Sequence, residues 1–255
     1  MTHHTWSRRQ MLLRGSAVFG SLLLGGCDRL SRSPSFQRVL DSAEQLTYRA
    51  QRLIVGQSLA HEFPESQLSP VFRSNGTSHP SSQFYNELLA AGFVDWRLAV
   101  RGLVAQPLDL SLAQLRAMPA RTQITRHDCV EGWSAIGKWT GVPLGFVLNL
   151  AGLQPEARFI VLYCADELER NDGGYYESVD LVDAFHPQTL LAYELNGRAL
   201  PVANGAPLRL RVERQLGYKQ AKYLMRIEAV AGFHTIGRGH GGYWEDRGYE
   251  WYAGI

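Results

Sequence analysis

Short segments of strand character recur along this chain, and no helices separate them in the regular way that a doubly wound parallel sheet requires. Each segment either alternates apolar and polar residues or is a mostly apolar run of strand length. They lie at 95–104, 122–125, 158–164, 189–200, 207–212 and 223–230. Because Asn196-Gly197 lies in the middle of the fourth segment, that segment predicts a β-hairpin. The pattern limits the chain to a strand-rich fold.

Helical signals are fewer. Apolar spacing predicts one amphipathic helix over roughly 35–55, a short helix within 107–119, and a helix that starts at Pro143 and stops at Gly152. The first helix could pack on the domain or lie on a membrane, and its scarcity of flanking basic residues favours packing.

A long loop rich in proline, serine and glycine follows the first helix. It covers 61–82, and loops of this length inside compact domains are usually functional. The chain has 255 residues, which is the size of one ordinary domain with small extensions. We therefore predict a mixed α+β domain over 70–255, preceded by a tether and the amphipathic helix over 28–69.

The N-terminal segment 1–27 is typical of an export signal. Arg8-Arg9 resembles a twin-arginine motif, whose pathway exports proteins already folded around a cofactor, and the apolar stretch after it is shorter than the about 20 residues that span a bilayer. Leu24-Gly25-Gly26-Cys27 resembles a lipoprotein signal, in which Cys27 is acylated; a plain signal cleaved nearby is the alternative. We expect a periplasmic or other extracytoplasmic protein, anchored to a membrane if Cys27 is lipidated.

The charge balance excludes one class of function. The whole chain has a formal charge of +2, but 1–27 contributes Arg8, Arg9 and Arg14 and no acid. Without these three, the 24 acidic residues slightly outnumber the basic ones. Since a nucleic-acid-binding protein needs a basic face, we expect no nucleic-acid partner.

One cysteine lies in polar surroundings within RHDCVEGWSAIGKW (126–139). The residues there predict a strand end at Cys129, then a polar loop and a helix start, a place where catalytic and ligand groups concentrate. Arg126 and His127 would favour the thiolate, the form that attacks electrophiles and binds soft metals. Because two cysteines of an exported protein pair by default, a disulfide with Cys164 also remains open, beside a metal ligand and a nucleophile. A zinc site is disfavoured, since no second Cys or His stands at zinc spacing.

Two further segments combine tight turns with basic residues. NGAPLRL (204–210) carries Arg209, and GYKQAKY (217–223) carries Lys219 and Lys222, two of the chain's three lysines. Basic groups held on glycine- and proline-shaped backbone suit a phosphorylated ligand. No GxxxxGK[ST] sequence is present, so this is not a nucleotide P-loop.

Three ordered motifs together resemble one known family. They are similar to motifs of the molybdopterin-binding domain of the sulfite oxidase superfamily. In chain order they are HDCVEGWS with the following W, G and PL, then HPQTLLAYELNG with LP and NGAPLRL, and then GYK with KY. The resemblance is strongest to the exported methionine-sulfoxide reductase catalytic subunits and extends over roughly 70–230. It implies a strand-rich α+β fold of the sulfite oxidase type and a molybdenum-molybdopterin cofactor.

The resemblance also implies roles by position. Cys129 would be the single protein ligand to molybdenum, and Asn204 with Arg209 would hold the pterin and its phosphate. The other residues that would contact the cofactor are Asn75, Cys164, Ala221, Lys222 and Tyr223. The relatives place a threonine where Cys164 stands. Asp183 and His186 also match family positions, and we interpret both as structural.

Two-electron oxygen-atom transfer is the chemistry that this resemblance implies. In sulfite oxidases, paired arginines suited to an anion follow the cysteine; here Glu131 and Trp133 take their place, which favours a neutral S-oxide or N-oxide such as methionine sulfoxide. A sulfite-oxidase-like dehydrogenase is one alternative, since Arg126 suits an anion. A non-enzymatic, lipid-anchored binding protein with a Cys129–Cys164 disulfide is the other.

Two further expectations concern partners and access. The sequence has no haem-ligand motif, so electrons would come from or go to a separate protein, such as a membrane haem subunit. The aromatic tail over 242–255 could close over the site, although packing on the core is the simpler interpretation.

Overall fold

The computed structural model describes residues 33–168 and 174–255, so the predicted export signal lies outside the described residues. It divides into two compact units, one that ends at Gly56 and one from Gln57 to Ile255, and each is described by itself. The described part of the first unit is helix α2 (Pro34–Val55), which confirms the predicted amphipathic helix. Pro34 suits the first turn, where a helix does not use the backbone N–H. Within the described ranges, no helix is long and apolar enough to cross a membrane.

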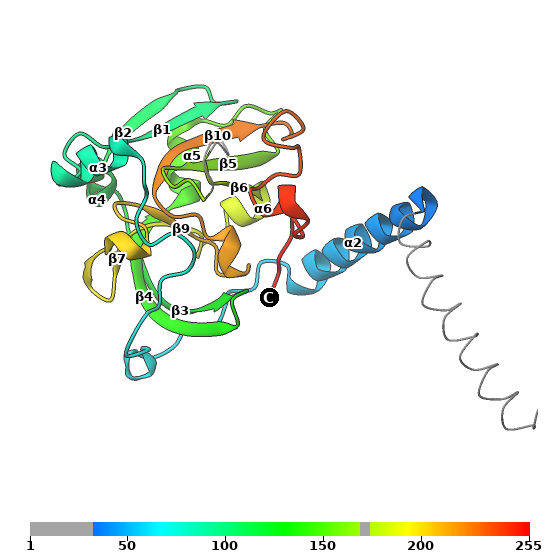
Figure 1. The fold of residues 1–255 in the computed structure, drawn as a ribbon, viewed down its shortest axis with the longest axis horizontal. Helices are drawn as coiled ribbons and strands as arrows, with labels where there is room; N and C mark the ends of the chain where they lie inside the picture. The colour runs from blue at the N-terminus through cyan, green and yellow to red at the C-terminus, as the bar shows by residue number, and fades with distance from the viewer. Residues whose placement is uncertain (1–32, 169–173) are drawn as a thin grey trace, which may run out of the picture. The chain divides into compact units, whose positions relative to one another are not determined.

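The first sheet of the second unit has five strands and carries most of the hydrophobic core. Its order is β2 (Leu108–Ser111), β1 (Arg97–Gly102), β10 (Leu224–Val230), β5 (Phe159–Cys164) and β6 (Tyr176–Asp180). Only β1 and β10 of this sheet pair in parallel; the other neighbours are antiparallel. Figure 1 shows these strands with helix α5 (Leu144–Ala151) beside them. The buried faces of the sheet and of α5 belong to one core cluster.

The second sheet is built on a long hairpin. β3 (Arg121–Cys129) pairs along its whole length with β4 (Trp133–Pro143), and β7 (Leu190–Leu195) continues the sheet to β8 (Arg198–Ala199) and β9 (Arg209–Arg211). The Asn196-Gly197 turn joins β7 and β8 with φ of 53° and 74°, which confirms the predicted hairpin. Gly141 is needed where β4 crosses β7, because a Cβ there would lie 2.3 Å from a backbone oxygen of Leu191.

The remaining helices are short. They are α3 (Gln83–Ala90), α4 (Leu112–Ala117), α6 (Leu181–Ala184) and the 3-10 turns η1 (Glu65–Gln67), η2 (Val202–Asn204), η3 (Gly217–Lys219) and η4 (Glu245–Arg247). Ser111 and Gln114 form a capping box that starts α4, so the helix predicted within 107–119 begins only after β2. Strands and short helices without regular βαβ alternation confirm the predicted mixed α+β class.

One local prediction was wrong. The residues after Cys129 do not start a helix: a three-residue turn leads into β4, and Cys129 pairs with Trp133 across it. Gly132 makes this possible with a φ of 84°, a conformation that glycine adopts without strain. Cross-strand pairing of a long β3 therefore overrides the local signal.

Asp183 and His186 have the structural roles expected of them. The Asp183 carboxylate accepts hydrogen bonds from Arg214 and Gln215, and its backbone N–H is capped by Asp180 at the start of α6. His186 is 2 % exposed, and its Nε2 lies 3.2 Å from the carbonyl oxygen of Ser58.

Candidate functional site

Cys129 opens onto a cavity of about 260 Å³ in the second unit. It is the last residue of β3, and the alternation of that strand places it on the buried face together with His127. The polypeptide segments that line the cavity are far apart in sequence: residues 75–77, 129–131, Asp166, Leu168, Tyr175, Gly217, Tyr218, Gln220, Lys222, Trp244 and Tyr249. Of the predicted cofactor contacts, Asn75, Cys129 and Lys222 line this cavity directly.

Lys222 fastens the loop that carries Asn75. Its Nζ donates to the carbonyl oxygens of Asn75 at 2.6 Å and of Ala203 at 3.1 Å, and also to that of Thr77. Burial, followed by the charge of Arg209, lowers the pKa of Lys222 to about 7. The side-chain Oδ1 of Asn75 is buried and has no hydrogen-bond partner within the described part of the chain. The lysine thus fixes the loop backbone and leaves the amide of Asn75 available.

Arg209 and Asn204 lie behind this lysine rather than on the cavity surface. Arg209 is 0 % exposed and donates to the carbonyl oxygens of Asn204 at 2.9 Å and Gln220 at 3.1 Å. Gly205 separates it from Lys222: a Cβ at this glycine would lie 2.9 Å from the Cβ of Lys222 and 3.2 Å from that of Arg209. The glycine in NGAPLRL therefore allows two cations to approach each other.

The other predicted contacts are close by but do not face the cavity. Tyr223 is fully buried and donates through its hydroxyl to the carbonyl oxygen of Thr77 at 2.9 Å. Ala221 accepts a backbone hydrogen bond from Leu210 and so joins its loop to β9. Cys164 ends β5, and burial, with the negative charges of Asp166 and Glu177, raises the pKa of its thiol well above the usual value.

The expectation that Arg126 and His127 favour a Cys129 thiolate was wrong. Arg126 lies on the opposite, exposed face of β3 and pairs with Asp128 at 2.9 Å. Burial and the positive charges of Arg211 and Arg209 hold the pKa of His127 well below its usual range, so the ring is neutral. Burial raises the pKa of Cys129 itself. Without a cofactor, the chain therefore favours the neutral, protonated thiol at Cys129.

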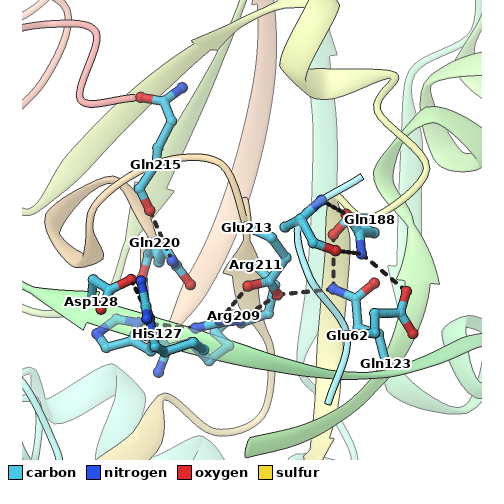
Figure 2. Close-up of polar contacts among 12 residues, drawn as sticks. Glu62, Gln123, His127, Asp128, Gln188, Arg209, Arg211, Glu213, Gln215 and Gln220 are labelled. Carbon is cyan, nitrogen blue, oxygen red and sulfur yellow. Dashed lines mark hydrogen bonds and ion pairs between the residues drawn. The ribbon is translucent and has the colours of Figure 1, made fainter. Parts of the chain in front are cut away.

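His127 is held by a buried ion pair (Figure 2). Its Nδ1 accepts from Nη1 of Arg211 at 3.0 Å, and Arg211 is bound by both carboxylate oxygens of Glu213, at 2.9 and 2.6 Å. Gln123 donates to the same glutamate at 2.8 Å. Since Nδ1 is the acceptor, the neutral ring carries its proton on Nε2, which faces Gly217 at the cavity.

Lys219 does not belong with the ligand-binding cations, contrary to the sequence interpretation. Its Nζ lies 2.7 Å from Oε2 of Glu177 and also pairs with Glu245, and all three side chains are buried. Two carboxylates therefore neutralise this lysine. Only the tertiary structure separates it from Lys222, three positions further along the same motif.

Sequence reasoning also missed two residues of the cavity wall. Asp166 is 4 % exposed, and burial raises its pKa to about 6. Tyr175 is buried and donates to the carbonyl oxygen of Tyr218 at 2.6 Å. An acid two residues after the end of a buried strand was a signal for Asp166, because functional groups gather at strand ends. Trp133 is not part of the cavity lining. Its indole N–H donates to Oε2 of Glu131, which does line the cavity, at 3.0 Å.

The arrangement calls for a polar, negatively charged ligand. Arg209 and Lys222 are buried cations that donate only to carbonyl and hydroxyl oxygens among the described residues. Nδ2 of Asn204 and Nε of Arg209 are buried donors for which residues 33–168 and 174–255 provide no partner. Buried charges and donors of this kind cost free energy until a ligand satisfies them.

Residues 88–234 match the family model described as the oxidoreductase molybdopterin binding domain. The chain belongs to this family and is an oxidoreductase, which confirms the family indicated by its three motifs. A protein of Azospira oryzae named "Putative protein-methionine-sulfoxide reductase subunit YedZ1" is 37% identical over 249 residues, covering 97% of this chain and 88% of that protein.

Two further relatives carry the name protein-methionine-sulfoxide reductase catalytic subunit MsrP. Those of Xanthomonas campestris and Ralstonia nicotianae are 38% and 37% identical over 144 residues, or 53% of this chain. This chain spans only 45% and 44% of their lengths. Among solved structures, the sulfane dehydrogenase SoxCD from Paracoccus pantotrophus aligns with a TM-score of 0.49 and 25% identity, over 54% of this chain and 39% of that one.

Proposed function

We propose that this chain is an exported molybdenum-molybdopterin oxidoreductase that reduces S-oxides of the methionine sulfoxide type. The observation that carries the proposal is a pair of buried cations at one cavity: Lys222 lines the cavity together with the free thiol of Cys129, and Arg209 lies behind Lys222. Its family binds molybdopterin, and the names of its relatives specify a methionine-sulfoxide reductase.

The residues present fit this cofactor. A pterin carries amide-like groups and a phosphate, and the site offers the buried, unpartnered atoms Oδ1 of Asn75, Nδ2 of Asn204 and Nε of Arg209. Arg209 and Lys222 would neutralise the phosphate, whose charge would in turn restore the pKa of Lys222. Cys129 would supply the sulfur ligand to molybdenum once its proton leaves. When bound, the cofactor supplies two-electron redox chemistry at a soft metal.

The proposed reaction converts a sulfoxide into a thioether and water. The sulfur–oxygen bond breaks, sulfur gains two electrons, and the oxygen takes up two protons. The chain's own residues orient the neutral substrate and exclude anions: Glu131 and Asp166 both line the cavity, and their negative charge disfavours a small dianion such as sulfite. Glu131 is itself held in place by the indole N–H of Trp133 and the backbone N–H of Gly76.

The disulfide-containing binding protein loses its main support. Cys129 and Cys164 are both free thiols in the structure. Because one lines the cavity and the other lies half-buried at the end of β5 and outside the cavity lining, they occupy different environments.

The proposal includes location and an electron partner. The twin-arginine motif and Leu24-Gly25-Gly26-Cys27 support export over 1–27 and a lipid anchor at Cys27, with 28–69 as tether and helix and 70–255 as the catalytic domain. The word "subunit" in the relatives' names supports a separate partner. A membrane haem protein would suit that role, because the sequence has no haem-ligand motif of its own.

Metal analysis and turnover test the function. Protein exported by a host that makes the cofactor should carry about one molybdenum and one pterin per chain and should reduce methionine sulfoxide with a reduced-dye donor. Cys129→Ser should lose most activity while the pterin remains, since the phosphate contacts are elsewhere. Cys164→Ser is the matched control and should be milder. Folded parent protein without molybdenum, or equal losses in the two variants, would rule the proposal out.

A further inference from the structure

One wall of the cavity is aromatic. Trp244, directly before η4, and Tyr249, two residues after it, line the cavity together with Tyr218 from η3. The rings of Trp244 and Tyr249 lie 5.3 Å apart at an interplanar angle of 31°, and Tyr218 meets Tyr249 edge-on at 5.2 Å. None of these three residues is among the predicted cofactor contacts.

The buried triad of Lys219, Glu177 and Glu245 fixes this wall. Lys219 directly follows Tyr218, and Glu245 directly follows Trp244, so their ion pair draws η3 and η4 together. A Cβ at Gly242 would lie 2.0 Å from Oε2 of Glu245, so the tail needs glycine there to pass the triad.

A second contact ties the tail to η3. The hydroxyl of Tyr218 donates to the carbonyl oxygen of Glu250 at 2.6 Å, beside Tyr249. The aromatic rings are therefore positioned by buried ionic and hydrogen-bond contacts rather than by the packing of a free tail.

The chemistry of the wall favours particular substituents. Aromatic faces attract thioether and sulfoxide sulfur and alkyl groups, and they offer nothing to a fully hydrated anion. Tyr249 is 42 % exposed, so its ring stands at the rim, whereas Trp244 is partly buried and packs against the core. A substrate with a long or branched arm would contact both rings, and one with only methyl groups would contact few ring atoms.

We propose that Trp244 and Tyr249, held by Tyr218 and the buried triad, bind the larger arm of the substrate and make this enzyme selective for sulfoxides with a methionine-sized or larger apolar arm. This inference rests on the proposed sulfoxide reduction and adds the part of the substrate that is recognised.

The test compares Trp244→Leu and Tyr249→Ala with the parent holoenzyme. The matched control is Phe84→Ala, because Phe84 is an exposed aromatic residue (60 %) of α3 outside the cavity. Calorimetric titration with the neutral methyl ester of N-acetylmethionine sulfoxide, without electron donor, gives Kd; dye-driven turnover of the same ester and of dimethyl sulfoxide gives KM. Molybdenum and pterin content are measured in every sample.

Each ring variant should raise Kd and KM for the N-acetylmethionine sulfoxide methyl ester by about tenfold, with dimethyl sulfoxide changed by less than about threefold and cofactor content unchanged. Phe84→Ala should change none of these. An equal change for both substrates, no change, or a loss of pterin that parallels the loss of binding would overturn the inference. If the parent carries the cofactor but reduces no sulfoxide, the proposed function fails, while the titration still decides whether the rings bind the arm.

Discussion

Removing the charge of Glu213 should lower the thermal stability of the fold. Its carboxylate binds Arg211 through two hydrogen bonds of 2.9 and 2.6 Å, and both side chains are 0 % exposed. In Glu213→Gln the arginine keeps its charge in a buried position without a carboxylate. Removing one partner of a buried pair typically costs about 3–5 kcal/mol. For a domain of this size, 1 kcal/mol lowers Tm by about 2–4 °C, so the expected loss is about 6–20 °C.

Two comparisons isolate this effect. Asp109→Asn removes one partner of the exposed Arg101–Asp109 pair (36 % and 59 % exposed), and it should cost at most about 1 kcal/mol. The double variant Arg211→Met/Glu213→Leu removes both charges and should recover most of the stability, because neither buried charge remains. Calorimetry gives the Tm of the parent and of these three variants, all in the cofactor-free form. The reasoning is refuted if Glu213→Gln is no less stable than Asp109→Asn, or if the double variant is no more stable than the single one.

Three other substitutions give direct tests. Gly217→Ala should destabilise the fold by about 1–3 kcal/mol, since its Cβ would lie 2.6 Å from Nε2 of His127, whereas Gly232→Ala, with no atom nearer than 3.5 Å, should be tolerated; thermal melts compare the two. Lys222→Met should weaken the pH dependence of the stability of the cofactor-free protein. The pKa of Lys222 is lowered from 10.5 to about 7 in the folded state, so between these values the unfolded chain binds more protons and the stability of the parent rises with pH. Thermal melts at about pH 6.5 and 9.5 measure the difference. Arg209→Ala should lower pterin occupancy while the apoprotein still folds, and unchanged occupancy would remove it from the phosphate site.

Local sequence predicted the elements better than the contacts between them. The hairpin at Asn196-Gly197 and the strand at 223–230 follow from turn chemistry and short-range alternation, which act within a few residues. The segment after Cys129 was misjudged, because a strand that pairs with a long partner is stabilised by residues outside the window that was read.

The sequence by itself determined the family, the Asn196-Gly197 hairpin and the glycine-shaped loops around Arg209 and Lys222, because motif order and turn residues are properties of the chain. Only the tertiary structure decided which of the basic side chains are paired with carboxylates. Lys219 and Lys222 are three residues apart, yet one is neutralised by Glu177 and Glu245 and the other donates to the carbonyl oxygens of Asn75 and Ala203. The physical reason is that burial and charge pairing depend on distances in space, and the partners that set them stand far apart along the chain.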